Sequence, residues 1–203
     1  MTNESVSVVI SRAERTLMDA RRSFQDLCGK DLSRRIPGLK NLVVYGRSFT
    51  FVLQNLRSFD REGFDQWYLS YEDEMRNDEL MKFFAGLRND LLKKGNSDTG
   101  TTLKIESLSL PEDAHLFGPK PPGATCLVMG DDGPAWIVKT AEGVEEKHYV
   151  QVPSRVADTS QSFRNPPRTH LGKSLKGKDT VELCNLYLQY LERMLVDAKQ
   201  HFL

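Results

Sequence analysis

The sequence lacks a long hydrophobic run, and this absence excludes a membrane-spanning helix. Nowhere do about 18 apolar residues occur consecutively, which is the length that a helix needs to cross a bilayer. The first residues, MTNESVSVVISRAERTL, mix polar and basic residues where a secretory signal peptide carries an unbroken apolar segment. We therefore expect an unexported, cytoplasmic protein with no membrane partner.

Cysteine is scarce, and neither sign of charge is in excess. The three cysteines, Cys28, Cys126 and Cys184, are odd in number and far apart. They offer neither a disulfide framework nor the paired spacing of a metal site. The 28 basic residues balance 28 acidic ones, so no overall field draws the chain to nucleic acid or to an anionic membrane. Any anion site must therefore be local.

Most enzyme motifs are absent as well. The sequence contains no phosphate-binding glycine loop, no Rossmann fingerprint, no nucleophile elbow and no paired His/Cys metal motif. We therefore expect neither a metal nor a cofactor. At 203 residues, of which 39% are hydrophobic, the chain is long enough for one core of ordinary size or two small ones.

What the sequence does contain is helical periodicity near both ends. Apolar residues recur at steps of three and four, which predicts four amphipathic helices. These cover about residues 5–28, 39–57, 62–94 and 179–201. Gly29 can end the first helix, and Asp78 can cap a restart that divides the third into two pieces. Asp179 and Glu182, three residues apart, form a capping-box pattern at the start of the last.

The helical period disappears between the third and fourth of these helices. Three short segments alternate with tight-turn residues, which predicts an antiparallel meander. These segments are Ala124–Met129, Ala135–Thr140 and Val144–Val152, and Leu103–Leu110 is a candidate fourth strand. We place this β-insert at about residues 100–153. It is followed by a polar, basic stretch, about residues 154–178, that we expect to be a loop.

The order of these elements predicts the fold class. Four helices of similar length, with the strands confined to one connection, are typical of an antiparallel bundle. We predict an α+β, mainly α fold: an antiparallel four-helix bundle with a small antiparallel β-meander inserted between helices three and four, in one domain over residues 1–203. The second predicted helix is more apolar than one monomer can cover. We therefore expect a homodimer that associates along the second and third predicted helices.

The third predicted helix carries a polar pair beside its buried stripe. Arg88 and Asn89 lie next to the stripe of Phe84, Leu87 and Leu91, at the edge of the predicted core. Such a pair has a plain structural use, because a guanidinium can bind a carbonyl or carboxylate and an amide can hold a neighbouring loop. This structural role stays open beside a functional one.

Residues 83–89 read Phe-Phe-Ala-Gly-Leu-Arg-Asn, and this segment resembles the motif of the HEPN superfamily (higher eukaryotes and prokaryotes nucleotide-binding). That motif is an arginine, a polar residue, three spacers and a histidine. The resemblance, which covers about residues 5–95 and 179–203, implies a small helical bundle that is often dimeric. Many members are metal-independent ribonucleases of toxin–antitoxin, phage-defence and RNA-processing systems. By position, the resemblance implies catalytic roles for Arg88 and Asn89 at a dimer interface.

The chain departs from the HEPN motif at the histidine, where it has Lys93. RNA transesterification needs a base of near-neutral pKa and cations that stabilise the charge on phosphorus. A lysine, with an ordinary pKa of about 10.4, supplies the cation without the base. We therefore expect Lys93 and its neighbour Lys94 to contact phosphate rather than to abstract a proton.

The basic stretch contains a second match to the looser HEPN spacing, from Arg164 through Arg168 to His170. Two consecutive prolines in this segment forbid a helix, so coincidence is the simpler interpretation. The alternative is that the stretch folds over the bundle and brings His170 to Arg88 as the missing base. In that case Arg164 and Arg168 would contact the RNA backbone. A polar connection before a helix remains the more ordinary explanation.

Two functions follow from the resemblance and both stay open. The first is an RNA-directed protein of a bacterial stress or defence system, acting as a metal-independent endoribonuclease at a dimer-interface groove and restrained by an antitoxin or a neighbouring-gene protein. The second is a non-catalytic dimeric module that binds nucleotide or serves only in assembly. The missing histidine favours the second, whereas the habits of the superfamily favour the first.

Overall fold

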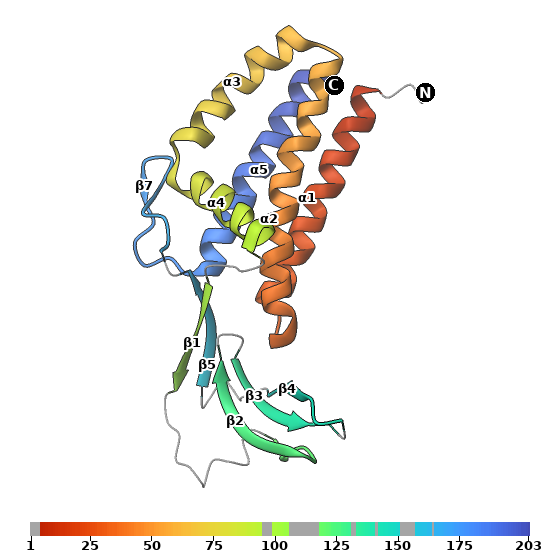
Figure 1. Cartoon of the computed structure of the whole chain (residues 1–203). Coiled ribbons are helices and arrows are strands. Elements are labelled where there is room, and N and C mark those ends of the chain that lie inside the picture. The colour runs from red at the N-terminus through yellow and green to blue at the C-terminus, as the bar shows by residue number, and fades with distance from the viewer. Residues whose placement is uncertain are drawn as a thin grey trace.

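A computed structural model of the chain shows a mainly helical α+β protein, as predicted (Figure 1). It describes residues 5–94, 99–105, 118–130, 133–140, 142–150, 157–163 and 165–203. Within these ranges the chain forms five α-helices, one short 3₁₀ helix and seven strands, which pair into three small antiparallel sheets. None of the described helices combines the length and the hydrophobicity that crossing a membrane requires.

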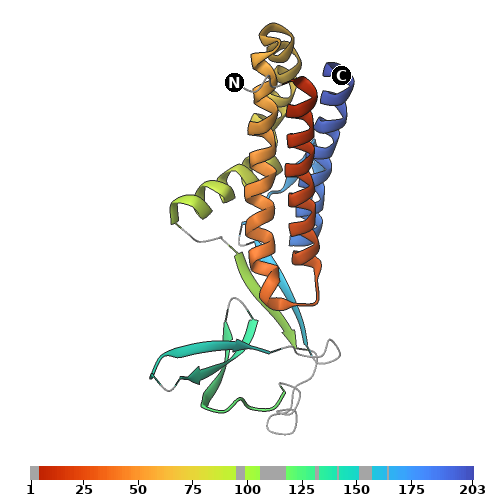
Figure 2. The same ribbon diagram turned by 90° about the vertical axis from the view of Figure 1, so that its right-hand side faces the viewer.

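Three long helices form the body of the molecule: α1 (Val6–Cys28), α2 (Leu32–Gln54) and α5 (Thr180–Phe202). They lie side by side, with α1 running opposite to α2 and α5 (Figures 1 and 2). The limits of α1 and α5 confirm the first and last predicted helices. The capping box of α5 is also confirmed, because the Asp179 carboxylate accepts from the Glu182 amide at 2.8 Å and the Glu182 carboxylate accepts from the Asp179 amide at 3.0 Å.

The start of α2 differs from the prediction, which placed it at residue 39 after Pro37-Gly38. Asp31 caps the helix by accepting a hydrogen bond from the Ser33 amide at 3.0 Å, so α2 begins at Leu32 and includes Pro37. Near a helix start, a proline removes a single backbone hydrogen bond. Gly38 then lets α2 approach α1 closely, because a Cβ at this position would lie 2.8 Å from the Leu27 nitrogen.

The third predicted helix, residues 62–94, is two helices: α3 (Arg61–Asn77) and α4 (Glu79–Lys94). They follow the short 3₁₀ helix η1 (Asn55–Ser58). Asp78 adopts an extended conformation between them, and its side chain accepts a hydrogen bond from the Met81 amide at 2.9 Å, which caps α4. The two helices take different directions, and α4 lies across the long helices (Figures 1 and 2). The restart capped by Asp78 is therefore confirmed, whereas a single helix over residues 62–94 is wrong and the four-helix bundle is not confirmed.

The predicted meander is present as the antiparallel sheet β2-β3-β4. Its strands are β2 (Ala124–Gly130), β3 (Gly133–Lys139) and β4 (Glu145–Tyr149). The candidate fourth strand belongs elsewhere: β1 (Thr99–Ile105) pairs with β5 (Ala157–Phe163) in a separate two-stranded ribbon, and the remainder of Leu103–Leu110 lies outside the described residues. The ribbon leads from the helices to the three-stranded sheet (Figures 1 and 2).

The expected loop at residues 154–178 is partly wrong, because it contains β5 and a hairpin of β6 (Thr169–His170) and β7 (Lys173–Ser174). Leu171 and Gly172 at the tip both have positive φ, 48° and 74°. This is the conformation that a tight two-residue hairpin turn requires. Neither β5 nor the β6–β7 hairpin shows an apolar alternation in the sequence. The structure of β5 is determined by its pairing with β1, and that of the hairpin by the pairing of β6 with β7.

Aromatic side chains hold α4 in place against its neighbours. The ring of Phe84 on α4 stacks on Tyr187 of α5, with centroids 4.1 Å apart and an interplanar angle of 7°. Phe83, also on α4, packs edge-on against Phe163 of β5 at 4.7 Å. These contacts fix both faces of α4, and with it the helix that carries the predicted functional residues.

Candidate nucleic-acid interface

Arg88 and Asn89 lie on the C-terminal half of α4, where the Arg88 side chain is half-buried and Asn89 is exposed. The guanidinium of Arg88 donates from Nη1 to Oδ1 of Asn89 at 3.2 Å. It also lies over the ring of Phe51 on α2, with its central carbon 5.8 Å from the ring centroid. The pair is therefore neither free in solvent nor part of an internal ion pair among the described residues.

A second arginine converges on the same ring. The guanidinium of Arg47, one turn before Phe51 on α2, lies 4.5 Å from the ring centroid and donates to the Thr50 hydroxyl at 3.1 Å. Phe51 itself is 43% exposed. We call Arg47, Phe51 and Arg88 the α2–α4 face. Neither guanidinium pairs with a carboxylate in the described part of the chain, so both positive charges remain uncompensated beside an exposed aromatic ring.

The α2–α4 face adjoins a pocket of about 520 Å³ between α2, α3 and α4, which we call the basic pocket. Its lining residues are Arg47, Thr50, Gln54, Tyr68, Glu72, Met75, Arg76, Met81, Lys82, Ala85 and Tyr187. Three of these are cationic and one is a carboxylate. That carboxylate, Glu72, pairs with Arg76 at 2.8 Å, which leaves the charges of Arg47 and Lys82 to dominate the pocket.

His170, the candidate base, lies at the other end of α4. Its ring is buried, and Nδ1 donates to Oδ1 of Asp78 at 3.0 Å. The other oxygen of Asp78 accepts from the Leu171 amide at 2.6 Å. We call this group of Asp78, His170 and Leu171 the α4 clasp. Asp78 precedes Arg88 by ten residues, about 15 Å along a helix, so the structure does not bring His170 to Arg88.

The Asp78 carboxylate is held in its charged form by these contacts. Burial opposes ionisation, but the hydrogen bonds from His170, Leu171 and Met81 outweigh it and lower the pKa of Asp78 from its usual value. A charged, fully engaged carboxylate orients the His170 ring and fixes the hairpin on α4. The geometry of the α4 clasp is thus that of a structural brace.

The remaining predicted residues do not form one cluster. Lys93 is exposed near the end of α4, and the side chain of Lys94 lies outside the described residues, as does Arg164. Arg168 is exposed beside the α4 clasp, where its backbone amide donates to Oε2 of Glu79 at 2.8 Å. The predicted set is therefore divided between the two ends of α4.

Sequence reasoning missed the α2 side of the site, namely Arg47 and Phe51, and the basic pocket beside it. A signal was present, because these two residues are four apart and therefore share one face of a helix. An apolar ring on a polar helix face, one turn after an arginine, identifies an exposed basic-aromatic pair. Lys82 could not be found in this way, because its place depends on the direction that α4 takes after Asp78.

The chemistry that this arrangement offers is anion binding. Arg47 and Arg88, which pair with no carboxylate among the described residues, and Lys82 can bind phosphate oxygens, and Phe51 offers a face for stacking. The described residues contain no group of three or more His, Cys, Asp and Glu side chains arranged to hold a metal ion. Of the described histidines, His148 lies in β4 and His201 stacks near Trp67 at the end of α5, so neither belongs to the α2–α4 face.

Residues 38–180 match the family model described as bacteriophage lambda protein ea47. No curated protein and no solved structure matches the chain. The family match covers more than half of the sequence and runs from within α2 to the first residue of α5, so it includes the α2–α4 face, all seven strands, the α4 clasp and every lining residue of the basic pocket except Tyr187. The chain therefore belongs to the bacteriophage lambda Ea47 family.

Proposed function

We propose that this chain is an RNA-binding protein of HEPN type that contacts single-stranded RNA through the α2–α4 face and the basic pocket, without cleaving it. The observation that carries the proposal is the convergence of Arg47 and Arg88 on the exposed ring of Phe51. Proteins that bind single strands combine a positively charged groove with aromatic rings on which bases stack. The α2–α4 face supplies both on a chain whose overall charge is zero.

Binding is better supported than cleavage. Cleavage of RNA at the 2′-hydroxyl needs a base, and Lys93 at the position of the HEPN histidine is a poor one at neutral pH. His170, the alternative, is engaged by Asp78 at the far end of α4. Arg88, Asn89 and Lys93 therefore act as phosphate contacts in this proposal, and Arg168 and His170 have structural roles.

The proposal includes a homodimer across the same helices. Leu92 on α4 is 58% exposed and follows Arg88 by one helical turn. A second copy seated on Leu92 would cover this apolar side chain, leave the Phe51 ring open and place two sets of arginines along one groove.

The proposal is tested by binding of a labelled, unstructured RNA oligonucleotide in the presence of chelator, measured by fluorescence anisotropy. Arg88→Ala and Arg47→Ala should each weaken binding about tenfold and flatten the dependence of log Kd on log salt by about 0.7, the value for one lost phosphate contact with a single strand. The matched control is Arg22→Ala, which removes an exposed arginine of α1 that pairs with Asp19. It should change binding little.

The outcomes separate the two functions. Equal binding by Arg88→Ala, Arg47→Ala and the control would overturn the proposal. Electrophoresis of the same RNA after incubation tests for cleavage. Metal-independent cleavage that disappears in Arg88→Ala would instead establish the ribonuclease, and replacing His170 would then show whether it is the base. Light scattering at tens of micromolar tests the dimer.

A further inference from the structure

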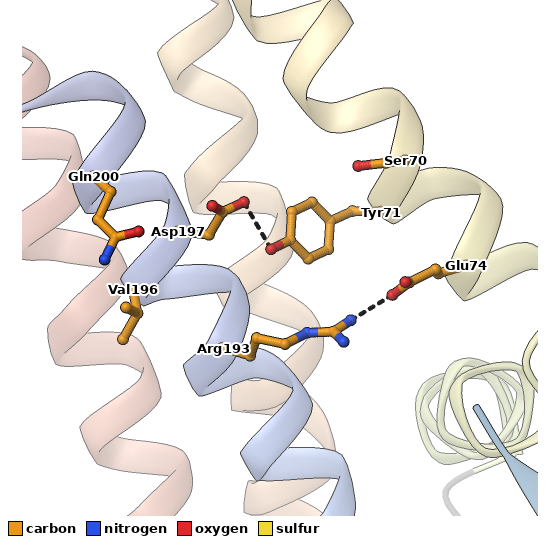
Figure 3. Close-up of a pocket in the computed structure, with 7 residues that line it drawn as sticks. All are labelled: Ser70, Tyr71, Glu74, Arg193, Val196, Asp197 and Gln200. Carbon is orange, nitrogen blue, oxygen red and sulfur yellow. Dashed lines mark hydrogen bonds and ion pairs between the residues drawn. The ribbon is translucent and has the colours of Figure 1, made fainter. Parts of the chain in front are cut away.

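A second pocket, of about 530 Å³, lies between α3 and α5 and is separate from the basic pocket. Its polar lining comes from Ser70, Tyr71 and Glu74 on α3 and from Arg193, Asp197 and Gln200 on α5. Figure 3 shows Tyr71 and Glu74 reaching from α3 towards α5, and Arg193 and Asp197 reaching back. The volume falls in the range typical of sites for small organic ligands.

Asp197 carries the unbalanced charge of this pocket. Its Oδ2 accepts two hydrogen bonds, from the Trp67 indole and from the Tyr71 hydroxyl, each at 2.8 Å. Both donors are neutral, so neither cancels the charge of the carboxylate. Burial and the neighbouring carboxylate raise the pKa of Tyr71, which therefore remains a protonated donor. Both hydrogen bonds converge on Oδ2, so that, within the part of the chain that the structure describes, the other oxygen, Oδ1, is left for a further donor.

The one cation in the lining is already engaged. Arg193 forms an ion pair with Glu74 across the pocket (Figure 3). Its guanidinium also lies over the Tyr190 ring, 4.8 Å from the centroid, which holds it in place. Arg193 and Glu74 therefore neutralise each other, and Asp197 leaves the pocket with a net negative charge. This is the opposite of the basic pocket, on the other side of α3.

We propose that the pocket between α3 and α5 binds a small organic cation through a guanidinium or primary ammonium group. Oδ1 of Asp197 is the anionic anchor. The Tyr71 ring, over which the Arg193 guanidinium also lies 5.8 Å from the centroid, forms an aromatic wall beside this anchor. The Ser70 hydroxyl and the Gln200 carbonyl supply neutral acceptors for the remaining N–H groups, so that a charged head group can be both paired and hydrogen-bonded.

The test uses the full chain and agmatine, which carries a guanidinium at one end and a primary amine at the other, in isothermal titration calorimetry. A second arm uses N-acetyl-arginine amide, which presents the same guanidinium as part of a peptide. If agmatine binds and N-acetyl-arginine amide does not, the ligand is a free small-molecule cation. If both probes bind, the site can also accept an arginine side chain of a peptide. We expect the wild type to bind agmatine with an affinity that falls as salt rises.

Two variants test the role of the Asp197 carboxylate and the need for an open pocket between α3 and α5. Asp197→Asn keeps an acceptor for Trp67 and Tyr71 but removes the negative charge, so it should lower the affinity for agmatine at least tenfold. Ser70→Trp, at an exposed position of α3, should fill the pocket and abolish binding while leaving Asp197 intact. The control is Glu192→Gln, which removes a carboxylate of α5 that pairs with Arg21 outside the pocket. It should bind agmatine as the wild type does.

Circular dichroism establishes that each variant is folded, and RNA binding should be unchanged in all three. If Asp197→Asn fails to fold, Ser70→Trp alone decides the result. The proposal is overturned if the wild type binds neither probe at millimolar concentration. It is equally overturned if a folded Asp197→Asn or Ser70→Trp protein binds agmatine with wild-type affinity.

Discussion

Loss of the Asp78 carboxylate from the α4 clasp should destabilise the protein strongly, because this one group accepts hydrogen bonds from three donors. Asp78 is 9% exposed and accepts hydrogen bonds from the amides of Met81 and Leu171 and from the ring of His170. Replacing it with alanine removes the cap of α4 and releases the hairpin of β6 and β7. Loss of a cap costs about 1 kcal/mol. Each buried donor left without a partner costs about 1–3 kcal/mol more.

We therefore expect Asp78→Ala to lower the free energy of unfolding by about 3–5 kcal/mol, because water that enters the vacated space satisfies part of what is lost. Asp78→Asn keeps a capping oxygen and one further acceptor, so its loss should be about 1–2 kcal/mol. Urea unfolding followed by circular dichroism measures both. Asp31→Ala, which removes only the cap of α2, is the control and should lose less than Asp78→Ala. A loss below about 1 kcal/mol in Asp78→Ala would refute the bracing role.

The same carboxylate predicts how stability depends on pH. Its pKa is lower in the folded state than in the unfolded chain, so ionised Asp78 stabilises the fold above its unfolded pKa of about 4. That contribution is lost as the pH falls through the folded pKa. The difference in unfolding free energy between the wild type and Asp78→Asn should therefore be largest near neutral pH and shrink below about pH 4. A difference that stays constant over this range would contradict the assignment.

Three further substitutions test the packing and the interface. Gly46→Ala places a Cβ 2.5 Å from Tyr187, so it should destabilise by about 1–3 kcal/mol in urea unfolding although alanine favours helix. At Gly86, in α4, an added Cβ would meet no atom within 4 Å, so Gly86→Ala should instead raise the free energy of unfolding by about 0.5–1 kcal/mol. A lower free energy of unfolding would contradict the open space at this position. Phe51→Ala should weaken RNA binding by about 1–3 kcal/mol, measured by fluorescence anisotropy, with little change in the stability of the protein. Unaltered affinity would exclude stacking of a base on this ring.

Local patterns predicted the elements whose structure depends on their own residues. The stripes of α1 and α5 and the capping box of Asp179 and Glu182 determine where those helices lie. The short segments between turn-forming residues likewise predicted the three strands that pair as β2-β3-β4. The start of α2 was missed because Pro37-Gly38 is typical of a helix break, whereas Asp31 caps the helix earlier and Gly38 serves the packing against α1.

Long-range pairing accounts for what the sequence did not show. β5 is polar and acquires its structure from β1, and His170 finds Asp78 across 92 positions of the chain. The pattern placed Arg88 correctly at the edge of the core, since its side chain is half-buried, whereas Asn89 is exposed. It did not predict Phe51 as their neighbour, because the direction of α4 is decided by Asp78 and by the stacking of Phe84 on Tyr187.

The ribbon of β1 and β5 returns the chain to the place that it left. Thr99 pairs with Phe163 at the end nearest the helices, and Ile105 pairs with Ala157 at the other end. Everything between Ile105 and Ala157 is thus a closed excursion, and exchanging it would leave the junctions with α4 and α5 where they are. The closing of a loop depends only weakly on its length, so this position tolerates large insertions and deletions. The helical body can therefore carry different distal parts, and chimaeras joined at these two residues offer a way to change what the distal end touches while the α2–α4 face stays intact.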